Sequence, residues 1–156
     1  MKGILIGLCL LCAGATQAQQ YNSAVGVRGG GLNSISYKKT LNDFSALEGI
    51  GSFRYSGLLL TGLYTIQNDF TAEGESFQWY YGGGAHIGIF NNRASFFNEG
   101  NSSTAVIGVD GVIGIEYTFS EIPLNLCLDY KPAINLIGYT GFWADHVSVG
   151  VRYVID

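Results

Sequence analysis

The chain is poor in the residues that build disulfide frameworks, metal sites and long helices. It has three cysteines, two histidines and two prolines in 156 residues. Cys9 and Cys12 fall in an N-terminal segment that we expect to be removed, so Cys127 remains alone and no disulfide framework is possible. With His86 and His146 as the two histidines, no transition-metal set is convincing. The sequence predicts neither a metal nor a cofactor.

Charge is also scarce. Charged residues make up 13% of the chain, whereas a soluble surface carries roughly 25–35%. Aromatic residues reach the same 13%, and 23 glycines are spread through strand-like segments. Something other than water is therefore expected to face much of the protein. The formal net charge of −4 and the lack of a basic stripe argue against binding to nucleic acid.

The first residues have the pattern of a secretory signal peptide. Lys2 supplies the positive charge, an apolar core runs from Ile4 to Ala13, and Thr16-Gln17-Ala18 is a small-x-small cleavage pattern. The segment is too short to span a bilayer by itself. We expect residues 1–18 to be a signal peptide and residues 19–156 to form one exported domain.

From Val25 to the C-terminus, apolar residues alternate with glycine and polar residues. The clearest stretch is 106–119, in which Ile107, Val109, Ile113, Ile115, Tyr117 and Phe119 share one parity. A period of two residues is typical of a β-strand whose two faces lie in different environments. Turn signals divide the chain into eight predicted strands, at residues 21–30, 32–40, 46–55, 58–67, 77–90, 104–119, 124–136 and 146–155.

A four-residue pattern occurs in both the first and the last predicted strand. Val25-Gly26-Val27-Arg28 opens the set of strands and Val149-Gly150-Val151-Arg152 closes it. If the sheet closes into a barrel, these first and last strands become neighbours. The short joints between strands predict an antiparallel, up-and-down order.

Alternation alone leaves open which parity faces inward. A soluble lipocalin-like barrel has an apolar interior, whereas a membrane barrel has a polar lumen and an apolar exterior. The polar parity is crowded with glycine, which suits a narrow interior, at Gly26, Gly82, Gly84, Gly88, Gly108, Gly114 and Gly150. Five cations on that parity are nearly balanced by four carboxylates, as charges held away from water require: Arg28, Lys38, Arg54, Lys131 and Arg152 against Glu48, Asp110, Glu116 and Asp129.

Aromatic residues on the outward parity gather near the predicted strand ends. With the first strand rising from the periplasmic side, one group falls near that rim: Tyr37, Tyr64, Trp79, Tyr81, Tyr117, Phe119 and Tyr153. A second group falls near the outer rim: Phe53, Tyr55 and Phe90. Such girdles are typical of membrane barrels. These three features favour the membrane arrangement.

With these features the chain resembles the small outer-membrane β-barrel family of Gram-negative bacteria, represented by the OmpA and OmpX membrane domains. The segments 79–86 (WYYGGGAH) and 115–119 (IEYTF) look typical of its short members. The resemblance implies a monomer in contact with outer-membrane lipid and lipopolysaccharide, inserted by the outer-membrane assembly machinery. Such proteins commonly end on an aromatic residue that this machinery reads, whereas this chain ends Tyr153-Val154-Ile155-Asp156. The signal is displaced to Tyr153 or the chain departs from the family here.

Two groups of residues invite a catalytic or metal-binding interpretation. His86 should lie close to Asp110 if residues 91–103 close a hairpin, and such a pair could act as a general base or simply form a hydrogen bond in the lumen. Asp110, Glu116 and Asp129 could be a glycosidase pair or a calcium site, but they lie beside Arg28, Lys131 and Arg152, which favours an ion network.

The sequence thus predicts an all-β protein: a closed, eight-stranded, antiparallel up-and-down transmembrane barrel behind a signal peptide. Eight strands leave an interior that side chains fill, so we expect a plugged polar lumen and a structural or loop-mediated role without catalysis. The predicted loops 91–103 and 137–145 carry aromatics that could contact a partner or lipopolysaccharide, but a place in the headgroup layer is the favoured interpretation. The alternatives are a secreted lipocalin-like barrel that binds a small apolar ligand, and a lipid-modifying outer-membrane enzyme.

Overall fold

A computed structural model describes residues 22–54, 57–70, 77–91, 103–138, 141–143 and 147–155. The predicted signal peptide lies outside these ranges. The described residues form ten strands: β1 (Ser23–Gly30), β2 (Asn33–Asn42), β3 (Ser45–Arg54), β4 (Gly57–Asp69), β5 (Phe77–Asn91), β6 (Ser103–Thr118), β7 (Leu124–Tyr130), β8 (Ala133–Ile137), β9 (Gly141–Trp143) and β10 (Val147–Val154).

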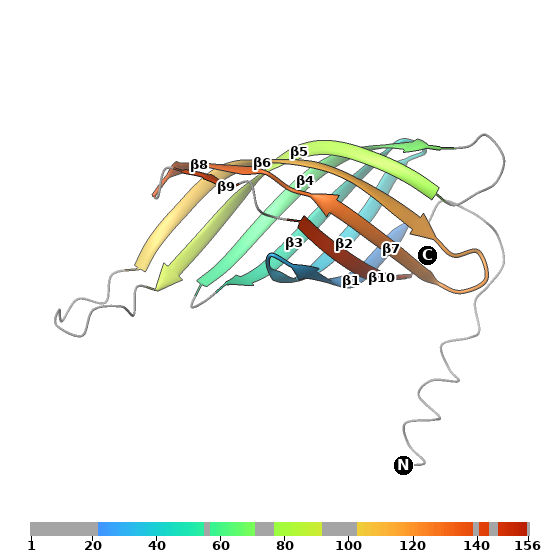
Figure 1. Ribbon diagram of the computed structural model, residues 1–156, viewed down its shortest axis with the longest axis horizontal. Coiled ribbons are helices and arrows are strands. Elements are labelled where there is room, and N and C mark those ends of the chain that lie inside the picture. The colour runs from blue at the N-terminus through green and yellow to red at the C-terminus, as the bar shows by residue number, and fades with distance from the viewer. Residues whose placement is uncertain are drawn as a thin grey trace, which may run out of the picture.

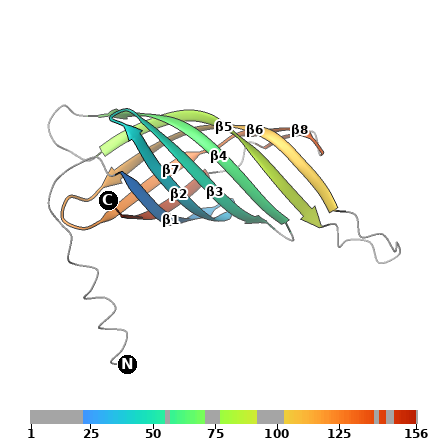
Figure 2. The same ribbon diagram turned by 180° about the vertical axis from the view of Figure 1, so that it is seen from behind.

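The ten strands make a closed antiparallel barrel of eight spans (Figures 1 and 2). β1 to β6 pair in sequence, and β7 and β8 both pair with β6 as one interrupted seventh span. β9 pairs with β8 and β10 pairs with β7, so these two form the eighth span. β10 then pairs with β1, placing Gly26 opposite Arg152 and Arg28 opposite Gly150. The neighbourhood predicted from the repeated Val-Gly-Val-Arg segments is confirmed.

Two strand predictions need correction. The predicted strand 124–136 is interrupted at Lys131 and Pro132, because proline has no N–H to give to the ladder. The Pro132 carbonyl instead accepts a hydrogen bond of 2.8 Å from the Gly111 amide. The predicted joint 137–145 contains a strand, β9, which extends the eighth span. It does so toward the end of the barrel that carries the β1–β2 turn, which we call the outer end. Its three residues carry too little alternation to be recognised from the sequence.

The two faces of the barrel wall differ sharply in chemistry. Large apolar side chains point outward on every span, including Val27, Ile35, Phe53, Leu60, Ile87, Ile113, Leu128, Leu136, Phe142 and Val149, each at least 45% exposed. The buried side chains are mainly polar or charged. This is the reverse of a soluble ligand-binding barrel, which keeps its apolar side chains inside.

Glycines on the inward parity are required by crowding. A Cβ atom added at any of the seven inward glycines predicted above would approach a neighbouring atom closer than 3.0 Å. On the outward parity, a Cβ added at Gly49 or Gly62 would meet nothing within 4 Å. The narrow interior therefore explains why glycine concentrates on the polar parity.

The outer end of the barrel is cut obliquely. β1 has 8 residues, whereas β5 and β6 have 15 and 16. In Figures 1 and 2, β5, β6 and β8 reach well beyond β1, β2 and β10 at that end. The wall is therefore short around β1 and β2 and tall around β5 and β6. Within the described ranges, no helix is long and apolar enough to cross a bilayer, a result that does not bear on spans made of strands.

Candidate functional site: the charged lumen

The lower half of the lumen, which is the half away from the outer end, holds a network centred on Arg152. The side chain of Arg152 is fully buried. Its guanidinium donates to Glu48 at 2.7 Å, to Asn125 at 3.0 Å and to Glu116 at 3.2 Å. Lys38 donates to the same Glu116 carboxylate at 2.7 Å, and the Gln67 amide donates to its other oxygen. This one cluster connects six spans, through residues on β2, β3, β4, β6, β7 and β10.

A second cation, Arg28, joins this network from β1. It donates to Glu48 at 3.0 Å and forms an ion pair with Asp129. Asp129 also accepts from the Tyr80 hydroxyl at 2.5 Å and from the Ser148 hydroxyl at 2.7 Å. Glu48 and Asp129 therefore each serve more than one donor, as a buried carboxylate with several lone pairs can.

The buried charges are balanced. Among the described residues, the buried cations are Arg28, Lys38, Lys131 and Arg152, and the buried carboxylates are Glu48, Asp110, Glu116 and Asp129. Charges that leave water cost several kcal/mol each unless they are paired and hydrogen-bonded. The pairing makes such an interior possible. Removing one partner leaves an uncompensated charge.

A separate polar cluster surrounds His86 in the outer half of the lumen. Its Nδ1 lies 2.7 Å from Asp110 and its Nε2 lies 2.8 Å from the Asn135 side-chain oxygen. The ring of Trp143 on β9 stacks on the imidazole with centroids 6.3 Å apart. Both ring nitrogens are engaged and His86 is 2% exposed, so nothing in this arrangement presents it to a substrate.

Lys131 lies beside this cluster with weak contacts. Its ammonium is 3.5 Å from Asp110 Oδ1 and 3.5 Å from the Thr61 hydroxyl. A charge-assisted contact is ordinarily about 2.7–2.9 Å long. Lys131 is nevertheless buried. It is the least well-satisfied of the lumenal cations whose contacts are described.

The structure places most of the predicted site residues on their expected faces. Nine predicted lumenal residues are buried, namely Arg28, Lys38, Glu48, His86, Asp110, Glu116, Asp129, Lys131 and Arg152. The side chain of Arg54 lies outside the described residues. Asp110 joins His86, whereas Glu116 and Asp129 join the lower network, so the three carboxylates are not gathered around one cleft.

Among the predicted girdle residues, Tyr37, Phe53, Tyr64, Tyr81, Tyr117 and Tyr153 are exposed on the outer surface. Trp79 stacks on Tyr81 at 5.5 Å, and Phe119 packs edge-on against Tyr117 at 4.9 Å. Phe90 departs from the predicted girdle, because it shares the inward parity of the buried residues His86 and Gly88. Tyr55 lies outside the described residues.

Sequence reasoning missed the uncharged members of the lumenal networks. These are Gln67, Tyr80, Asn125, Asn135, Trp143 and Ser148. Most share the parity of the charged residues on their strands, and that signal could have identified them. Cys127 is buried as a free thiol, and a Cβ on Gly150 would collide with its sulfur. Among the described residues, no group of histidine, cysteine and acidic side chains is placed to hold a metal ion.

Comparison with known proteins agrees with this architecture. No protein-family model matches the chain, and no curated protein matches it. Among solved structures, the chain is similar to the N-terminal β-barrel domain of Pseudomonas aeruginosa OprF, with a TM-score of 0.67 and 17% sequence identity. The match covers 86% of this chain and 98% of that one. At this identity the likeness shows a common fold, and the predicted closed, eight-stranded antiparallel barrel is confirmed.

Proposed function

We propose that this protein is an integral outer-membrane barrel of a Gram-negative bacterium, with a closed polar lumen and a structural or loop-mediated role without catalysis. One observation carries the proposal: apolar side chains cover the outside of the wall and ion pairs fill the inside. Exposed apolar patches on soluble monomers rarely exceed a few hundred Å². An apolar surface on every span is suited to hydrocarbon.

The lengths of the spans support a membrane location. About 9–11 tilted residues are enough to cross a bilayer as a strand. β2 to β6, with 10 to 16 residues, reach or exceed this length, and β1, with 8 residues, falls just short of it. With β1 rising from the periplasmic side, the start of β1 and the end of β10 lie at the periplasmic rim, and the end of β5 and the start of β6 lie at the outer rim.

The closed lumen is supported by what fills it. The largest fully buried side chains include Arg152, Tyr80, Lys38, Leu63 and Glu48. An apolar cluster of Ile50, Leu63, Tyr80 and Val112 occupies the interior beside the ion pairs. An eight-stranded barrel has an interior just wide enough for its side chains, so a general porin function is disfavoured.

The non-catalytic role is supported by the burial of His86, whose nitrogens are both held by neighbours. Contacts with a partner are then left to the outer loops. The predicted loops 91–103 and 137–145 fall largely outside the described residues, so their role stays a proposal. The expected partners are outer-membrane lipid, lipopolysaccharide and, during insertion, the assembly machinery.

Electrophoresis in SDS with and without boiling tests the proposal. Protein extracted from membranes should migrate as two species, a folded form before heating and an unfolded form after it, because a closed barrel with its charges sealed inside resists SDS. A secreted soluble barrel would instead be recovered without detergent and show no such shift. A large steady conductance in planar bilayers would contradict the closed lumen specifically.

A further inference from the structure

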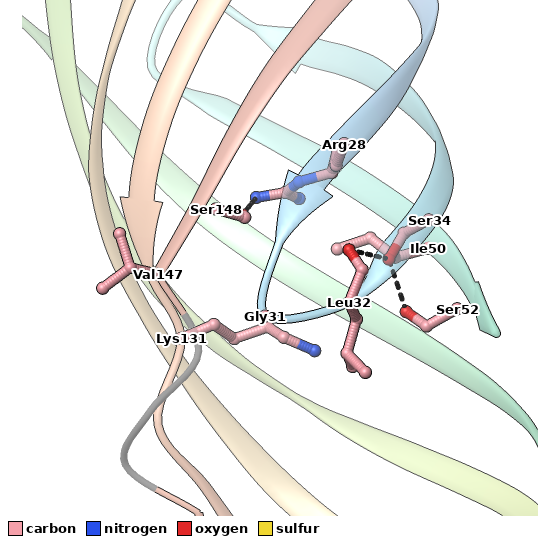
Figure 3. A pocket seen from close by; sticks show the side chains of 9 residues that line it. All are labelled: Arg28, Gly31, Leu32, Ser34, Ile50, Ser52, Lys131, Val147 and Ser148. Atoms are coloured by element: carbon pink, nitrogen blue, oxygen red, sulfur yellow. Dashed lines mark hydrogen bonds between the residues drawn. The ribbon is translucent and has the colours of Figure 1, made fainter. Parts of the chain in front are cut away.

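The short side of the barrel wall leaves a small pocket at the outer end of the lumen. The pocket is lined by Arg28, Gly31, Leu32, Ser34, Ile50, Ser52, Lys131, Val147 and Ser148. Figure 3 shows Arg28 reaching into it from β1 and Lys131 from the joint between β7 and β8, with the Ser34 and Ser52 hydroxyls in the same space. Among the described residues that line the pocket there are two cations and three serines, and no carboxylate.

The position of this pocket follows from the oblique end of the barrel. The wall stops at the β1–β2 turn, where the Gly31 amide donates to the Val147 carbonyl at 3.2 Å. β8 continues beyond this level, and in the described part of the chain β9 pairs with β8 alone. The outer faces of the taller spans remain apolar there, at Ile87, Ile89, Ile107, Ile134 and Leu136. In the proposed orientation the pocket therefore opens at the level of the outer leaflet.

Lys131 gives the pocket its affinity for an anion. An ammonium group has three donor hydrogens, yet both described contacts of Lys131 are 3.5 Å long. Arg28 is already paired with Glu48 and Asp129, so an added anion gains less from it than from Lys131. A buried ammonium with long contacts gains from any oxygen anion that reaches hydrogen-bond distance.

The size of the pocket limits what can enter. Its volume is about 20 Å³, and a cavity of roughly 10–15 Å³ holds one water-sized atom. One oxygen of a phosphate group fits, while the rest of the group must stay outside. We propose that the pocket binds one oxygen of a phosphate on an outer-leaflet lipid headgroup, with Lys131 as the main donor and the Ser52 hydroxyl, which accepts from Ser34, as a further donor. This inference rests on the proposed membrane location.

Lipid titration tests the site on the mature protein, folded in maltoside micelles because these contain no phosphate. The probe is dihexanoyl phosphatidic acid, compared with dihexanoyl phosphatidylcholine and with inorganic phosphate. The readout is the NMR shift of the backbone amides of Gly31, Ser34 and Ser148. Phosphatidic acid should shift these amides saturably and bind at least about tenfold more tightly than either comparison, the step expected of one charge-assisted hydrogen bond.

Variants then assign the binding to the pocket. Lys131→Gln should weaken phosphatidic acid binding about tenfold or more. Lys39→Gln removes the same charge from an exposed position on β2 and should leave binding unchanged. Ser34→Val keeps both cations but adds bulk to the lining of the pocket and removes the hydroxyl that Ser52 accepts from. It should therefore also weaken binding, and it tests the site if Lys131→Gln does not fold.

Three results would overturn the inference: unchanged binding in both pocket variants, equal responses to phosphatidic acid and phosphatidylcholine, or shifts confined to residues far from the pocket. Inorganic phosphate that binds as tightly as phosphatidic acid would overturn the lipid as the source of the phosphate. Each sample is also run in SDS with and without boiling. A heat-modifiable barrel that fails to bind refutes the site alone, whereas a protein that shows no folded form in detergent refutes the proposed function.

Discussion

Two glycines on neighbouring strands should respond in opposite ways to the same substitution. Gly84 on β5 faces the lumen, and a Cβ there would come closer than 3.0 Å to the backbone of Gly62 and Leu63. Overpacking of this kind costs about 1–3 kcal/mol. Replacing a strand glycine with alanine otherwise gains about 0.5–1 kcal/mol. Gly84→Ala should therefore destabilise the barrel, by up to about 2.5 kcal/mol.

Gly62 on β4 is the matched control, because it faces outward and a Cβ there would meet nothing within 4 Å. Gly62→Ala should stabilise the barrel by about 0.5–1 kcal/mol. Urea unfolding in detergent, followed by loss of the heat-modifiable band, measures both variants. If the two substitutions shift the urea midpoint in the same direction by the same amount, the assignment of inner and outer faces is wrong.

Two further predictions concern the ion network. Glu116→Gln removes the carboxylate shared by Lys38 and Arg152 and should lower the free energy of unfolding by about 3–5 kcal/mol. Lys39→Gln, at an exposed position, is the control and should change it by less than about 0.5 kcal/mol. Similar urea midpoints for the two variants would contradict a sealed network. Tyr80→Phe removes the hydroxyl that donates to Asp129 and should cost about 1–3 kcal/mol in the same assay, so a variant as stable as wild type would show that this hydrogen bond is not formed.

The strand count and the inner face could be predicted because both are local properties of the sequence. Alternation over residues 106–119 gives the period directly. The two Val-Gly-Val-Arg segments identify the strands that close the barrel. Pro132 could have indicated the break between β7 and β8, because proline has no N–H to donate within a sheet. β9 carried none, because three residues cannot establish a period.

The membership of each lumenal cluster depends on register, which alternation does not provide. Parity places Asp110, Glu116 and Asp129 inside, but their heights depend on how far each strand slides along the next. Asp110 lies opposite Gly84 and Asp129 opposite Gly114. These pairings separate the His86 cluster from the Arg152 network. The stacking of Trp143 on His86 depends further on β9, which the sequence did not reveal.

The most direct test of the account uses the two tryptophans in lipid vesicles that contain brominated acyl chains. Trp79 lies on the outer surface beside Tyr81, while Trp143 packs against buried His86. In Trp143→Phe, the remaining Trp79 fluorescence should be strongly quenched. In Trp79→Phe, the remaining Trp143 should be quenched little. Equal quenching of both, or no quenching of Trp79, would contradict a barrel with hydrocarbon outside and its charges within.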